Sequence, residues 1–140
     1  MGKGNGKVYR YRSIWLDCWN HFYATPSEEK TKMSIFNKIS IFLNNNTSLR
    51  YTTKSTYGSK MKFVFRYIYV DTSWRAYIVS SPGYGYRSTS MGDTHRYYDT
   101  GRSMHYVCWT QPLTRFADVV EISKVWARET AKYIATGESF

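Results

Sequence analysis

Alternation of apolar and polar positions, the period of a half-buried strand, recurs along the chain. The longest such run extends from Lys60 to Val70, and its apolar face consists of Met61, Phe63, Phe65, Tyr67 and Tyr69. Its opposite face carries three cations, Lys60, Lys62 and Arg66, among valine and isoleucine residues. The same pattern predicts further strands over residues 8–15, 48–55, 74–80 and 104–109, with turns at 57–59 and 71–73.

Apolar residues at spacings of three and four predict two helices. The first covers residues 26–43: Thr25, Pro26 and Glu28 have the spacing of a capping box, and the asparagines at 44–46 end the pattern. The second begins after Thr114, its expected N-cap, and ends at Gly137. Its apolar side consists of Phe116, Val119, Val120, Trp126, Tyr133 and Ile134.

This order of elements predicts an α+β fold, an antiparallel β-sheet of about five strands with two helices packed on one face, in the order β-α-β-β-β-β-α. The turns after 48–55 and 60–70 are too short for parallel crossovers. Residues 81–103 lack periodicity and are predicted as a long polar loop. Residues 1–7 alternate glycine with Lys and Asn, which predicts a flexible basic arm, and residues 8–140 are expected to form a single domain.

The charge of the chain indicates a class of partner. Twenty Lys and Arg against ten Asp and Glu give a net charge of +10, so the field of the protein attracts polyanions. The excess is largest in residues 51–110, where eight cations face three carboxylates, whereas residues 111–140 are neutral. Nucleic acid is the favoured partner, with an acidic protein surface or solubility alone as alternatives.

Cysteine usage and hydropathy indicate a compartment. The chain has two cysteines, Cys18 and Cys108, and its N-terminus lacks the apolar core of a signal peptide. We therefore expect a cytoplasmic protein with two free, part-buried thiols. No apolar run approaches the roughly 20 residues that span a bilayer, so no membrane partner is expected.

Arginine, lysine and tyrosine alternate through residues 57–102, and the candidate binding residues among them are Lys60, Lys62, Arg66, Arg75, Tyr84, Tyr86, Arg87, Arg96, Tyr97, Tyr98 and Arg102. Cations bind phosphates while aromatic faces stack on unpaired bases, which favours single-stranded DNA or RNA, or a nucleoprotein complex. Two other interpretations remain open. Such alternation also keeps an open sheet face soluble, and the same residues suit a protein partner.

The sequence contains no complete motif for catalysis or for cofactor binding. Gly83-Tyr84-Gly85 lacks the Lys and the further glycine that phosphate-binding loops require, so no cofactor is expected. No HxH, HExxH or CxxC spacing is present, so no metal is expected. His95, with Asp93, Asp99 and His105 nearby, would be the base in one alternative, a small nuclease or phosphodiesterase. The sequence favours a non-enzymatic binding protein.

The stretch Tyr106-Val107-Cys108-Trp109, followed by Trp126-Ala127 and residues 133–137, resembles small proteins of bacteriophages and mobile elements. The resemblance covers mainly residues 104–140 and assigns no functional residue. It implies an alternative function in the cytoplasm of a host cell, inhibition of a host nucleic-acid enzyme by direct binding, in the manner of anti-CRISPR proteins. Many such inhibitors are acidic mimics of DNA, and the basic charge of this chain departs from that pattern.

Overall fold

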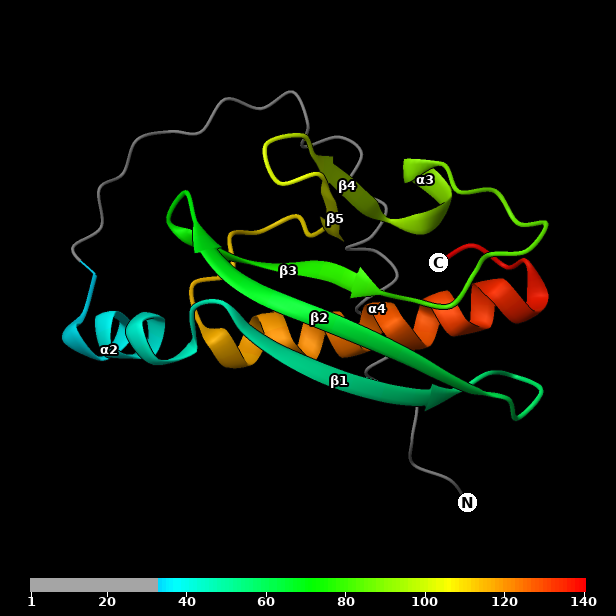
Figure 1. Ribbon diagram of the computed structural model, residues 1–140, viewed down its shortest axis with the longest axis horizontal. Helices are drawn as coiled ribbons and strands as arrows, with labels where there is room; N and C mark the ends of the chain where they lie inside the picture. The colour runs from blue at the N-terminus through cyan, green and yellow to red at the C-terminus, as the bar shows by residue number, and fades with distance from the viewer. Residues whose placement is uncertain (1–32) are drawn as a thin grey trace, which may run out of the picture.

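The computed structural model describes residues 33–140. Five strands form one antiparallel sheet in the order β1-β2-β3-β5-β4: β1 Thr47–Lys54, β2 Lys60–Val70, β3 Ser73–Ser80, β4 Arg96–Asp99 and β5 Met104–Val107. The helices are α2 Ile35–Asn44, α3 Met91–Thr94 and α4 Phe116–Thr136 (Figure 1). The predicted α+β fold is confirmed. The predictions for the arm, for strand 8–15, for the capping box and for helical residues 26–32 lie outside the described residues. Residues 33 and 34, also predicted as helical, are not, because α2 begins at Ile35 with Ser34 as its N-cap.

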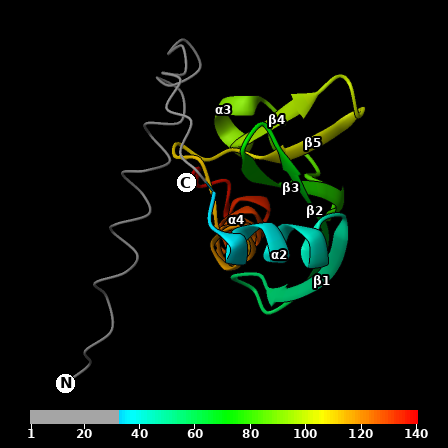
Figure 2. The ribbon, with the colours of Figure 1, turned by 90° about the vertical axis from the view of Figure 1, so that its left-hand side faces the viewer.

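One face of the sheet packs against α4 (Figure 2). Trp126 of α4 belongs to the core between them and is fully buried. The rings of Phe63 and Phe65 each lie 5.9 Å from the Trp126 ring in edge-on geometry, and all three side chains are fully buried. Tyr67 from β2 and Ser123 from α4 share a buried hydrogen bond of 2.7 Å between their hydroxyl oxygens. The apolar face predicted for residues 60–70 therefore belongs to the core. The residues between them in the strand face away from α4.

The boundaries of α4 differ from the prediction at one end. Its N-cap is Arg115 rather than Thr114, and no side chain caps the first amides. Asp118 in the first turn complements the positive end of the helix dipole and lies 4.0 Å from the Arg115 guanidinium. At the other end, Gly137 adopts φ 80° and ends the helix as predicted.

The segment 81–103, predicted as a loop, contains two short elements. Ser90 caps α3 by accepting a 3.2 Å hydrogen bond from the Asp93 amide, and β4 then pairs with β5 at the edge of the sheet. Trp126 holds this segment in place, because its indole nitrogen donates a 2.9 Å hydrogen bond to the Thr94 carbonyl. The loop prediction is wrong here because elements of four residues are too short to show a periodic pattern.

The predicted hairpin between β2 and β3 is present, and its two turn residues, Asp71 and Thr72, have φ of 49° and 64°. Positive φ at both central positions is the geometry of a type I′ turn, which matches the twist of the two strands.

Cys108 is disulfide-bonded, so the prediction of a free thiol is wrong for this residue. The other cysteine of the chain, Cys18, lies outside the described residues. Disulfides are rare in a reducing cytosol. The disulfide of Cys108 therefore does not support the predicted cytoplasmic setting, which stays a prediction.

Within residues 33–140, no helix combines the length and the apolar character that crossing a bilayer requires.

Candidate functional site

The sheet face opposite α4 carries five cations on two neighbouring strands, and we call this group the basic face: Arg50, Lys54, Lys60, Lys62 and Arg66. β1 and β2 contain no Asp or Glu. Among the described residues, none of the five cations forms an ion pair. All except the half-buried Arg66 are exposed. The basic face is thus an accessible strip of uncompensated positive charge, roughly 20 Å long at about 3.4 Å per strand residue.

The register of the two strands brings these cations close together. Lys54 lies directly opposite Lys60, and Arg50, opposite Val64, has Lys62 and Arg66 as its diagonal neighbours. Directly opposed residues have Cβ atoms about 4.5–5.5 Å apart, and like charges at this distance destabilise a sheet. The arrangement costs stability in the free protein and would be relieved by a bound anion.

A row of tyrosines continues this face across the other strands, and we call Tyr77, Tyr106 and Tyr97 the tyrosine row. Arg66 pairs with Tyr77, Tyr77 with Tyr106, and Tyr106 with Tyr97, which places all four side chains on one face. The Tyr106 ring lies 5.5 Å from the Tyr77 ring and 5.6 Å from the Tyr97 ring. Burial raises the pKa of all three phenols. The row is therefore a neutral, packed layer beside the basic face.

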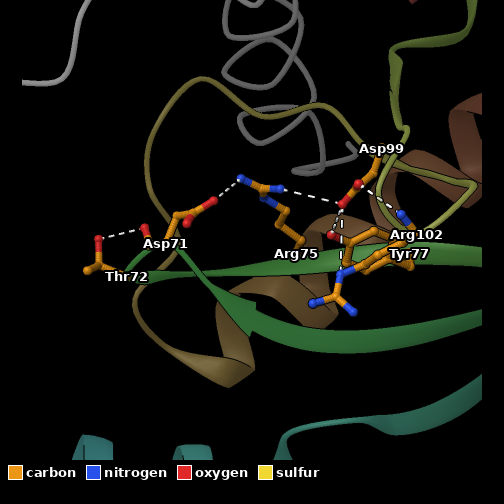
Figure 3. Close-up of polar contacts among 6 residues, drawn as sticks. All are labelled: Asp71, Thr72, Arg75, Tyr77, Asp99 and Arg102. Carbon is orange, nitrogen blue, oxygen red and sulfur yellow. Dashed lines mark hydrogen bonds and ion pairs between the residues drawn. The ribbon is translucent and has the colours of Figure 1, made fainter.

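Asp99 contacts both the tyrosine row and two of the predicted binding residues, Arg75 and Arg102 (Figure 3). Its Oδ2 accepts a 2.7 Å hydrogen bond from the Tyr77 hydroxyl and lies 3.8 Å from a guanidinium nitrogen of both Arg75 and Arg102. The Arg75 guanidinium also lies 4.9 Å from the centre of the Tyr106 ring, and that of Arg102 lies 5.6 Å from the centre of the Tyr77 ring. Since both cations already have a carboxylate partner, they are less available to an anion than the basic face.

The ionisation of Asp99 depends on this contact. The hydrogen bond from Tyr77 lowers the pKa of Asp99 below its ordinary value of 3.8, with smaller contributions from backbone amides and from Arg75. Asp99 therefore stays ionised under all but strongly acidic conditions and keeps a negative charge beside Arg75 and Arg102. Asp71 makes the closer contact to the Arg75 guanidinium, at 2.9 Å.

Three of the predicted loop residues serve the fold. Tyr84 is buried, with its ring 6.2 Å from that of Tyr133 and 4.9 Å from the guanidinium carbon of Arg96. Arg87 donates hydrogen bonds of 3.3 Å and 3.2 Å to the carbonyls of Ile134 and Ala135 at the end of α4. In these positions Tyr84, Arg87 and Arg96 are not free to bind a partner.

The remaining predicted aromatic residues are accessible. Tyr86 is fully exposed in the loop after β3, and Tyr98, on the edge strand β4, is about half exposed beside the ring of His105. Neither residue belongs to the face that carries Lys60, Lys62 and Arg66.

His95, the predicted base of the enzymatic alternative, ends α3 in a left-handed backbone conformation with φ 46°. Its ring lies 4.8 Å from that of Phe140, and burial lowers the pKa of the imidazole. Within residues 33–140, no group of three or more His, Cys, Asp or Glu side chains is placed to hold a metal ion. The surroundings of His95 are those of a packed residue at the end of a helix.

The predicted site residues do not include Arg50 and Lys54, which belong to the basic face, or Tyr57 in the turn between its strands. The signal was present: residues 48–55 alternate, and an antiparallel hairpin puts their polar side beside that of residues 60–70. Tyr57 is 76% exposed in the β1–β2 turn, between Lys54 and Lys60. The turn thus presents an aromatic ring at one end of the basic face.

Comparison with known proteins gives no match to any protein-family model, any curated protein sequence or any solved structure.

Proposed function

We propose that this protein binds nucleic acid through the basic face, with phosphates on the cations of β1 and β2. The observation that carries the proposal is the uncompensated charge: five cations gather where two strands contain no carboxylate, and two of these cations, Lys54 and Lys60, directly oppose each other. A purely structural surface gains nothing from this arrangement, because like charges opposite each other destabilise the sheet. A chain of phosphates removes the repulsion and releases counterions.

Single-stranded DNA or RNA is the favoured ligand. Tyr57 lies in the β1–β2 turn, between Lys54 and Lys60 in the chain, and offers an exposed ring. An unpaired base stacked on such a ring contributes about 1–3 kcal/mol. A duplex hides its bases from this contact, so it would engage the cations alone. The proposed order of affinity is therefore single strand above duplex.

The test compares two triple variants with the same change in net charge. The first variant replaces Arg50, Lys60 and Lys62 by Gln. The control variant replaces Lys124, Arg128 and Lys132 of α4 by Gln. Both are titrated with labelled single-stranded DNA, RNA and duplex DNA at about 50 and 200 mM salt. The first variant should bind single strands at least tenfold more weakly, with a salt slope smaller by about 2, since each phosphate contact contributes about 0.7. The control should bind like the unmodified protein.

Equal losses in both variants would show that net charge alone drives binding, and would overturn the assignment of the basic face. If the unmodified protein bound none of the three nucleic acids, direct recognition would be excluded. The predicted alternative, inhibition of a host nucleic-acid enzyme by binding to its protein or nucleoprotein form, would then be the function to pursue.

A further inference from the structure

The apolar side of α2 faces solvent. Its five large outward residues are Ile35 at 68% exposure, Phe36 at 80%, Ile39 at 51%, Phe42 at 86% and Leu43 at 68%. The helix contains no buried residue. Apolar patches of a few hundred Å² are the most that a typical monomer exposes, and larger ones mark interaction surfaces.

The orientation of α2 is the reverse of ordinary amphipathic packing. The side that faces the rest of the protein consists of Asn37, Ser40, Ile41 and Asn44, of which only Ile41 packs against the core. A helix of ten residues is marginal in isolation and is normally held by burial of its apolar side. Here that side is free within the described residues, so α2 lacks the contact that would usually stabilise it.

We propose that α2 pairs with α2 of a second copy of this chain, in an antiparallel, two-fold symmetric dimer. The order of the outward residues supports self-pairing, because Ile35-Phe36, Ile39 and Phe42-Leu43 read almost the same in both directions. With the two-fold axis at Ile39, Phe36 of one copy faces Phe42 of the other, and Ile35 faces Leu43. An isologous interface requires this kind of self-complementarity.

Charge and area are consistent with a second copy as the occupant. Lys38 is the sole charged residue among residues 33–46, so two copies of net charge +10 can approach here with little repulsion. A stable interface buries about 800 Å² per partner. Phe36 and Phe42 bury about 150–250 Å² each, which supplies roughly half of that area, and the three aliphatic side chains add to it. α2 lies on the α4 side of the sheet (Figure 2), so the pairing leaves the basic face open.

The first experiment is sedimentation equilibrium of the full chain without nucleic acid, at about 5 to 200 μM. The expected mass is twice the 16.5 kDa of the chain. Ile39→Asp should weaken association at least about 30-fold, the effect of a central interface residue. Lys38→Glu, which changes a charge on the same helix outside the apolar side, should leave the dimer intact. Melting temperatures of both variants report whether each is folded.

A mixing experiment tests the antiparallel register. Phe36→Glu and Phe42→Lys should each be monomeric alone, because each buries a charge against phenylalanine. An equimolar mixture should regain the dimer mass, since the heterodimer pairs Glu with Lys on one side and retains Phe against Phe on the other. A parallel pairing would not be rescued.

A wild-type chain that stays monomeric to about 200 μM would overturn the proposal, as would a dimer indifferent to Ile39→Asp. If the monomer instead floated with anionic lipid vesicles through α2, a lipid surface would be the occupant and the dimer would be excluded. None of these outcomes depends on binding of nucleic acid by the basic face.

Discussion

The hydroxyl of Tyr77 donates a 2.7 Å hydrogen bond to Oδ2 of Asp99, which joins the middle of β3 to the end of the edge strand β4. β3 and β5 are paired in register at a single position, Tyr77 with Tyr106, so the backbone ladder between them is short. The side-chain contact between Tyr77 and Asp99 adds a second link between β3 and the two-stranded edge of β5 and β4.

Replacing Tyr77 by Phe keeps the ring against Tyr106 and removes only the hydroxyl. We expect the free energy of unfolding to fall by about 1 kcal/mol, the net contribution of a typical hydrogen bond. Urea denaturation at neutral pH measures the loss. A loss near zero would show that Asp99 is held equally well by its other partners.

The same pair predicts a dependence on pH. The pKa of Asp99 is lowered in the folded protein, so its ionisation stabilises the fold above the ordinary value of 3.8, and this contribution disappears as the pH falls through the folded pKa. Wild type should therefore exceed Tyr77→Phe in stability by a constant amount from about pH 5 to 7, and by less below about pH 4. Denaturation curves across this range test the sign, and a difference that grew in acid would contradict it.

Lys54→Glu is expected to stabilise the protein while weakening its binding to nucleic acid. The substitution converts the opposed pair of Lys54 and Lys60 into an attractive pair, which contributes about 0.2–1 kcal/mol to stability. It also puts a carboxylate into the basic face, so affinity for single strands and its salt dependence should both fall. Thermal melts and fluorescence titrations give the two measurements.

Lys38→Glu on α2 is the matched control, because it makes the same change in charge away from the basic face. It should leave affinity nearly unchanged. If Lys54→Glu lowered stability, or weakened binding no more than Lys38→Glu, the unfavourable cation pair would not be a feature of binding.

Elements with a long periodic pattern could be predicted from the sequence, and elements fixed by tertiary contacts could not. The bounds of β2 are as expected, because eleven alternating residues leave little ambiguity. β4 was missed because its four residues become a strand only through pairing with β5, and α3 because its position depends on the contact between Trp126 and Thr94.

The candidate site was predictable where it follows strand alternation. Lys60, Lys62 and Arg66 lie together on an open face because residues two apart in a strand share a side. Tyr84, Arg87 and Arg96 were grouped with them by composition alone, and their burial against α4 or one another depends on long-range contacts that no local pattern encodes. Arg50 and Lys54 needed the register of β1 with β2.

Cys108 should be unreactive before reduction, because its sulfur is in a disulfide and no thiolate is available to attack an alkylating agent. Protein purified without reductant, unfolded in guanidinium and treated with iodoacetamide should yield an unmodified Cys108 peptide only after the disulfide is reduced following alkylation. Peptide mass spectrometry makes the measurement. Direct alkylation of Cys108 in the unreduced sample would contradict the disulfide.

Arg87→Ala separates a structural role from a binding role at a residue that composition assigned to the site. Arg87 donates to two carbonyls at the end of α4, where a positive charge also complements the helix dipole, so its loss should cost about 1–2 kcal/mol of stability. Arg87→Lys keeps the charge but lacks the forked guanidinium, so its stability should lie between that of the wild type and that of Arg87→Ala. Both variants should bind single strands with the affinity of the wild type, when assayed where all are folded. A loss of affinity without a loss of stability would instead place Arg87 in the binding surface.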